Sequence, residues 1–121
     1  MVVKSKIKYG KLSRIITSTR NYLNKVMPGV LARVEWHFYR VYKKNFVEYF
    51  IKDPIRAYHA LLDLYGGAIE GEGSARHVIY YLLKGLFMGN NAFVEHAYRA
   101  ILEEDEKTFD EVLREYISLI K

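Results

Sequence analysis

One predicted helix gathers cations and the only tryptophan of this sequence on one face. The spacing of apolar residues predicts a helix from Val30 to Lys52. Its polar side covers about one third of the helical wheel, with His37 at the border. That side comprises Arg33, Trp36, Arg40, Lys43, Lys44 and Val47. Guanidinium and ammonium groups can neutralise successive phosphates, and an indole ring can stack on an unpaired base. This face therefore predicts a nucleic-acid-binding surface.

A second pattern has the outline of a helix-turn-helix unit. Two expected helices flank the loop from Gly66 to Ser74, and the second of them would carry an outward stripe of Arg76, Tyr80 and Lys84. However, the loop is longer than the usual connection of about three or four residues. It also contains acidic residues, which phosphate would repel. Arg76 and Lys84 are kept as candidate nucleic-acid contacts, and a helical hairpin with a mobile loop is the alternative.

Catalytic and metal-binding patterns are missing from the sequence. Without cysteine the chain has no thiolate nucleophile, disulfide or cysteine-ligated metal. His59 and Asp63 are spaced i, i+4, and Glu95-His96 lies further along, but neither HExxH nor Glu-x-x-His occurs. No serine lies in a G-x-S-x-G elbow. We therefore expect a non-enzymatic protein with no metal, cofactor or small-molecule substrate, and a His59 that is hydrogen-bonded or exposed.

Charge is distributed unevenly along the chain, although the net charge is only +5. Residues 1–60 hold thirteen basic and three acidic residues, a net charge of +10, whereas residues 61–121 hold six and eleven, a net charge of −5. Such asymmetry indicates an anionic partner or self-association. Bases before the Val30–Lys52 helix could extend the positive surface: Lys4, Lys6, Lys8, Lys11, Arg14, Arg20 and Lys25. Alternatively, the two halves of one chain neutralise each other.

The hydrophobic periodicity predicts only helices, because no strand-like alternation competes with it. Glycine, proline and asparagine separate the segments. The expected helices are Leu12–Val26, Val30–Lys52, Pro54–Tyr65, Ala75–Met88, Ala92–Glu103 and Glu106–Ile120. We expect an all-α protein, a single compact bundle of five to six helices that forms one domain over residues 1–121. Residues 1–11 are expected to form a flexible basic N-terminal segment.

The expected Val30–Lys52 helix has more apolar surface than a helix buries when it packs against a bundle through one face. Its main apolar stripe contains Val30, Leu31, Val34, Phe38, Val41, Tyr42 and Tyr49. A second stripe of Tyr39, Phe46 and Phe50 lies on a neighbouring face. Such a helix is either central in the fold or shared with a partner. The second possibility predicts a homo-oligomer, in which the acidic run from Glu103 to Glu106 of another copy could face the basic half.

Composition adds two further expectations. Glutamine and cysteine are absent and lysine, arginine and glutamate dominate the charged residues, which leans toward a heat-adapted composition. The sequence has no apolar run near the ~20 residues of a membrane span and no signal-like N-terminal run, so a cytoplasmic location is expected without membrane contact. The combined hypothesis is a small nucleic-acid-binding or regulatory protein, with a protein interaction or assembly module as the alternative.

Overall fold

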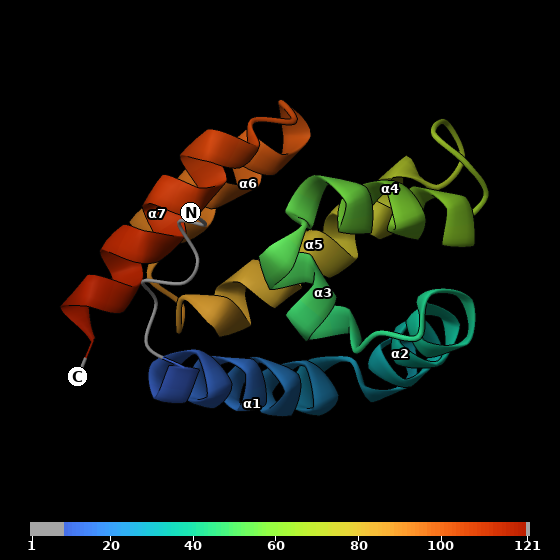
Figure 1. Ribbon diagram of the computed structural model, residues 1–121. Helices are drawn as coiled ribbons and strands as arrows, with labels where there is room; N and C mark the ends of the chain where they lie inside the picture. Colours follow the sequence, from blue (N-terminus) through green and yellow to red (C-terminus); the bar gives the residue numbers. More distant parts are fainter. Residues whose placement is uncertain (1–8, 121) are drawn as a thin grey trace.

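The computed structural model describes residues 9–120, and these residues form seven α-helices and no strand (Figure 1). The helices are α1 (Tyr9–Val26), α2 (Pro28–Tyr42), α3 (Phe46–Lys52), α4 (Pro54–Leu64), α5 (Glu72–Leu86), α6 (Asn91–Leu102) and α7 (Glu106–Leu119). The all-α class is confirmed. The expected number of five to six helices is too low, because the segment predicted as one helix from Val30 to Lys52 is two.

The break between α2 and α3 is a sharp elbow at Lys43, Lys44 and Asn45. Lys43 has a left-handed backbone with φ of 58°, and Asn45 is extended before the first turn of α3. The elbow brings the Phe38 and Phe46 rings to 4.9 Å between centroids. Residues eight apart on an unbroken helix are separated by about 12 Å along its axis. The aromatic contact therefore requires the chain to turn back.

Folding back at the elbow buries most of both apolar stripes within one chain, although Tyr39 and Val41 remain 63% and 51% exposed. The residues of α3 that are buried are Phe46, Val47, Phe50 and Ile51. Those of α2 are Leu31, Val34 and Phe38. The surplus apolar surface, which suggested a helix shared with a partner, is thus largely covered by the protein itself.

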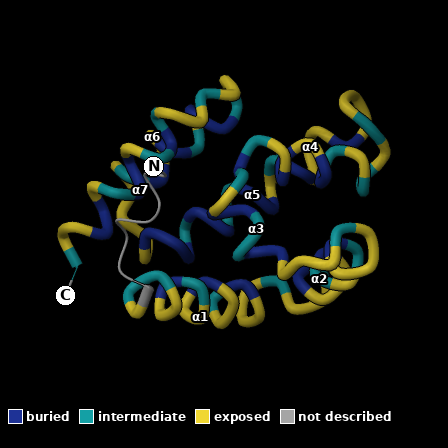
Figure 2. Tube along the Cα trace, viewed as in Figure 1, coloured by how far each residue is buried: buried dark blue, intermediate teal, exposed yellow. Residues whose placement is uncertain are grey.

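Helix α5 lies at the centre of the fold, where α1, α4 and α6 all pack against it. Figure 1 shows α5 passing behind α3 and α4, with α1 below and the α6–α7 pair at the upper left. Helix α1 approaches α5 closely at Gly85, where an added Cβ would lie 2.9 Å from Cδ2 of Tyr22. Buried apolar side chains from all seven helices form the core. In Figure 2, α3 and α5 are mostly buried, whereas the outer turns of α1 and α2 are exposed.

Most helix ends lie where the sequence predicts them. Prolines open α2 and α4, and the side chain of Asp105 accepts a hydrogen bond from the backbone N–H of Thr108 at the start of α7. Helix α5 begins at Glu72, before the predicted start at Ala75, because a compact turn across Gly66–Gly71 shortens the loop and leaves Ser74 inside the helix.

The N-terminal expectation is corrected in part. Residues 9–11, which were expected to belong to a flexible segment, form the first turn of α1. Residues 1–8, including Lys4, Lys6 and Lys8, lie outside the described part of the chain. Within residues 9–120, no helix combines the length and the apolar character needed to cross a bilayer.

Candidate nucleic-acid interface

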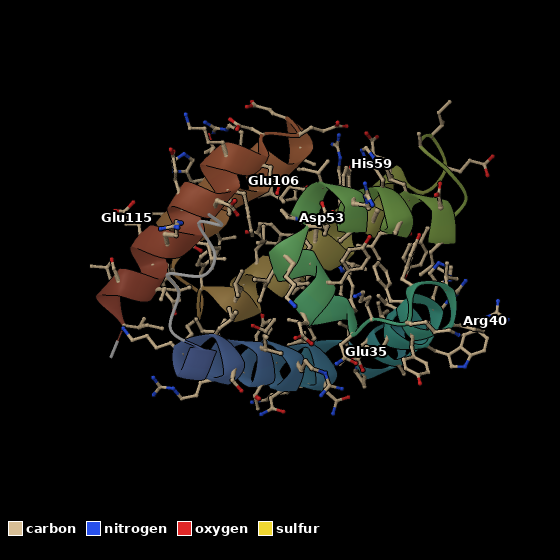
Figure 3. All side chains as sticks on the ribbon, in the orientation of Figure 1. Glu35, Arg40, Asp53, His59, Glu106 and Glu115 are labelled. Carbon is tan, nitrogen blue, oxygen red and sulfur yellow. The ribbon has the colours of Figure 1, made fainter. Side chains whose placement is uncertain are left out.

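The outer surface of α2 and the elbow carry a group of exposed aromatic and basic side chains. Trp36 is 61% exposed and Tyr39 is 63% exposed, both unusual for large aromatic residues. The exposed cations of the same surface are Arg33, Arg40, Lys43 and Lys44. We refer to Trp36, Tyr39, Arg40, Lys43 and Lys44 together as the α2 face. In Figure 3, Arg40 projects from the outer edge of α2 at the lower right, away from the other helices.

Two aromatic–cation pairs organise the α2 face. The Arg40 guanidinium carbon lies 4.5 Å from the Trp36 ring centroid, and Nζ of Lys43 lies 5.9 Å from the Tyr39 ring centroid. Both pairs are spaced i, i+4, so they lie side by side on consecutive turns. Cation–π attraction of about 0.5–1 kcal/mol at exposed sites favours these conformations over fully solvated ones. The face thus presents rings and positive charges together.

Arg33 and Val47 differ from the other predicted members of this surface. Arg33 lies 5.6 Å from the Tyr65 ring centroid, so it is directed toward the end of α4. Burial raises the pKa of the Tyr65 hydroxyl, and the charge of Arg33 offsets part of this shift. Val47 is fully buried, and its assignment to the polar face is wrong because the elbow rotates α3 relative to α2.

Acidic side chains do not neutralise the α2 face. The only carboxylate of α2, Glu35, accepts hydrogen bonds at 2.6 and 2.9 Å from Arg20 of α1. This bidentate contact raises the pKa of Arg20 and engages the Glu35 charge. Among the described residues, no carboxylate forms an ion pair with Arg40, Lys43 or Lys44.

A groove of about 530 Å³ continues from the α2 face across the elbow. Its lining comprises Tyr39, Lys43, Lys44, Asn45, Glu48, Tyr49, Lys52 and Asp53. The two acids in this lining have local partners. Glu48 accepts a hydrogen bond from the Asn45 amide at 3.5 Å and lies 3.8 Å from Nζ of Lys52, and Asp53 lies 3.6 Å from Nε of Arg56. The groove is therefore polar, and it is basic on the side that meets α2.

The second predicted surface, on α5, is engaged within the fold. Arg76 makes an ion pair with Glu72 at 2.7 Å and donates a longer hydrogen bond to the Tyr58 hydroxyl at 3.5 Å. Lys84 lies 5.8 and 5.6 Å from the ring centroids of Tyr80 and Tyr81. Both cations are only partly exposed. The predicted stripe is thus partly exposed, and contacts with α4 and α6 engage Arg76 and Tyr80.

Neighbouring contacts explain why the α5 stripe does not form a free recognition surface. The Tyr80 hydroxyl donates to Glu95 of α6 at 3.4 Å, and its ring meets that of Tyr98 at 5.4 Å between centroids. Helix α5 is thus a central packing element rather than a projecting helix. Helices α4 and α5 therefore do not favour a helix-turn-helix unit, because such a unit needs a recognition helix that projects far enough to enter the major groove.

The acidic residues of α7 lie away from the α2 face (Figure 3). Figure 3 places Glu115 of α7 at the left and Glu106 in the upper middle, both across the molecule from Arg40 at the right. One side-chain contact that joins the two halves is a hydrogen bond between Nε2 of His59 and Oε2 of Glu104, at 3.0 Å. His59 is exposed and hydrogen-bonded, as predicted. Among residues 9–120, no three histidine or acidic side chains gather into a possible metal site.

Sequence reasoning missed three contributors to this surface. Tyr39 was assigned to an apolar stripe, whereas Asn45 and Tyr49 line the elbow groove. The i, i+4 spacing of Tyr39 and Lys43 matches that of Trp36 and Arg40, so spacing alone contained the signal for the second pair. The groove had no such signal, because it exists only where the helix breaks.

Comparison with known proteins adds no functional assignment to this geometry. No protein family, curated protein or solved structure matches the chain.

Proposed function

We propose that this protein binds nucleic acid through the α2 face and acts without catalysis. The observation that carries the proposal is the shared exposure of Trp36, Arg40 and Lys43, whose cations form no ion pair with a carboxylate among residues 9–120. An exposed tryptophan beside cations contributes little to the core, whereas it suits contact with a charged partner that also offers flat rings.

The mechanism follows from the two kinds of side chain on the face. Arg40, Lys43 and Lys44 would contact phosphates and release condensed counterions, which supplies most of the binding free energy. Trp36 would stack on a base. Phosphate contacts carry no sequence information, so we expect modest sequence preference. The buried side of α2, including Val34 and Phe38, fixes the helix on the core and holds these groups in place.

The experiment is a titration of a fluorescently labelled oligonucleotide with the full chain at several salt concentrations. If Arg40, Lys43 and Lys44 each contact a phosphate, the logarithm of the association constant should fall with the logarithm of salt with a slope of about −2 to −3. Absence of binding at the lowest salt concentration would refute the proposal. Sedimentation of the protein alone supplies the competing outcome: a dimer that weakens with salt, in a protein that binds no oligonucleotide, favours the assembly module instead.

A further inference from the structure

We infer that the nucleic acid recognised by the α2 face is single-stranded, with unpaired bases stacked on Trp36 and Tyr39 and the strand turning into the elbow groove. This inference rests on the proposed function and specifies its substrate class. Its basis is the exposure of both rings, their position on adjacent turns and the polar groove that continues from them.

The two rings form a short stacking platform. Trp36 and Tyr39 are spaced i, i+3, which brings their Cβ atoms to about 5–6 Å on a helix surface. A duplex keeps its base faces inside the helical stack, so it offers exposed rings little to contact. An unpaired strand offers a ring face at every nucleotide, and base–aromatic stacking is the usual means of binding it without sequence preference. The platform therefore favours a single strand.

The cations lie where a strand crossing these rings would place its phosphates. Arg40 lies over Trp36 and Lys43 lies beside Tyr39, so each ring has a positive charge within 6 Å of its centroid. The Arg40 guanidinium is itself a flat group on which a base can stack. Alternation of rings and cations along one surface matches the alternation of bases and phosphates along an unpaired strand.

The elbow groove extends this surface in one direction. Its volume of about 530 Å³ lies within the range of roughly 300–1,000 Å³ that is typical of small-molecule sites, so a nucleobase fits. Lys43 and Lys44 line it on the α2 side, where they would hold phosphate. Asn45 and Tyr49 supply an amide and an aromatic ring for a base. Glu48 and Asp53 would repel phosphate, which keeps the backbone on the lysine side.

The test uses Trp36 as the reporter, because it is the only tryptophan. The full chain is titrated with a mixed-sequence DNA strand of about twelve nucleotides, with its duplex, and with the RNA strand of the same sequence and its duplex. We expect tryptophan quenching by a single strand and at least about tenfold tighter binding of that strand than of its duplex. Tighter binding of the single strand than of its duplex, whether in DNA or in RNA, supports the inference.

Variants at Tyr39 separate stacking from charge. Tyr39→Ala should weaken single-strand binding by about fivefold or more and change duplex binding less than twofold, whereas Tyr39→Phe should bind like the unaltered protein because the ring remains. Ile69→Ala removes an apolar side chain that is 90% exposed on the α4–α5 loop and serves as the matched control. Thermal unfolding checks that each variant is folded.

The outcomes distinguish the inference from the proposed function. Salt-dependent binding of strand and duplex with equal affinity, without quenching, would overturn the inference and leave nucleic-acid binding intact. Equal losses for Tyr39→Ala and Tyr39→Phe would also overturn it, since a ring would then have no role. Binding of neither form at low salt would refute the proposed function itself.

Discussion

The α2 face and the α5 stripe share one residue spacing in the sequence, but they differ in how far their side chains are exposed. In each, an aromatic residue is followed four residues later by a cation: Trp36 and Arg40 on α2, Tyr80 and Lys84 on α5. On α2 the ring is 61% exposed and the cation has no acidic partner among the described residues. On α5 the ring meets Tyr98 of α6, and Lys84 is half-buried between rings.

The difference lies in what packs against each helix. Helix α5 is surrounded by α1, α4 and α6, so its polar side chains find partners inside the fold. Helix α2 is packed on one side only, mainly by α1 and α3, and its other side faces solvent. Equal spacing thus predicts which residues share a face, while the packing of neighbouring helices decides whether that face is open to a partner.

The largest expected effect tests whether the elbow supports the α2 face. Phe46 is fully buried against Phe38, so Phe46→Ala should lower the free energy of unfolding by about 3–5 kcal/mol. Urea denaturation followed by circular dichroism measures this change. The exposed-site variant Ile69→Ala should stay within about 0.5 kcal/mol. A loss below about 1 kcal/mol for Phe46→Ala would show that the elbow packing does not hold the structure.

The second prediction compares the two cationic surfaces directly. The double variant Arg40→Ala/Lys43→Ala should weaken oligonucleotide binding by about tenfold at low salt and reduce the salt slope by about 2. The matched variant Arg76→Ala/Lys84→Ala removes the same number of positive charges from α5. It should leave oligonucleotide affinity within about threefold and the salt slope nearly unchanged, because salt screens the effect of these α5 charges on a nucleic acid bound at the α2 face. Equal losses from both variants would mean that net charge, not the α2 face, determines binding.

The third prediction separates backbone from charge at Lys43. A left-handed conformation costs an L-residue roughly 1 kcal/mol, and glycine avoids this cost, so Lys43→Gly should raise stability by up to about 1 kcal/mol. If Lys43 contacts phosphate as proposed, the same substitution should also weaken oligonucleotide binding. Lys43→Ala loses the charge without relieving the backbone, and it should weaken binding equally with no gain in melting temperature. A destabilised Lys43→Gly variant would contradict the described elbow.

The smallest expected effect is on the pH dependence of stability, and it concerns Asp105 at the start of α7, away from the α2 face. The hydroxyl of Thr108 donates to Asp105 at 2.7 Å and its N–H donates at 3.1 Å, and these bonds lower the pKa of Asp105. A lowered folded-state pKa stabilises the protein above the unfolded-state pKa, and this contribution is lost as the pH falls through the folded-state value.

The melting temperature tests this sign. Between about pH 6 and pH 3, it should fall more for the unaltered protein than for Asp105→Asn, which lacks the titrating carboxylate. Oligonucleotide affinity at neutral pH should be the same for both, because Asp105 lies at the start of α7, remote from the α2 face in sequence and in packing. A parallel fall in both proteins would show that Asp105 contributes nothing to the acid sensitivity.

Much of the fold could be predicted because most helices have one clear apolar face. In α7 the residues at i, i+3 and i+4 spacing are buried as predicted, among them Phe109, Val112 and Leu113. The elbow was not predicted, because residues 43–45 contain neither glycine nor proline and Asn45 is the only residue there that marks a possible break. The elbow is accompanied by the contact of Phe38 with Phe46, which is a tertiary interaction that helical periodicity does not report.

The candidate site shows the same division. Trp36 and Arg40 were placed correctly because they lie before the elbow, where helical periodicity still holds. Val47 was misplaced because it lies after the elbow. Arg76 pairs with Glu72 one turn earlier in α5, a spacing visible in the sequence, whereas its contact with Tyr58 of α4 depends on the packing of two helices. Helical periodicity predicts which residues share a face of an unbroken helix, but it does not predict which faces other helices bury.

The most direct test is a map of amide chemical shifts, recorded for isotope-labelled protein with and without a single-stranded oligonucleotide. If the α2 face binds nucleic acid, shift changes should concentrate between Arg33 and Asn45, with the indole N–H of Trp36 among the most affected signals. Changes concentrated between Arg76 and Lys84, with the signals of the α2 face unmoved, would contradict the assignment of nucleic-acid binding to α2.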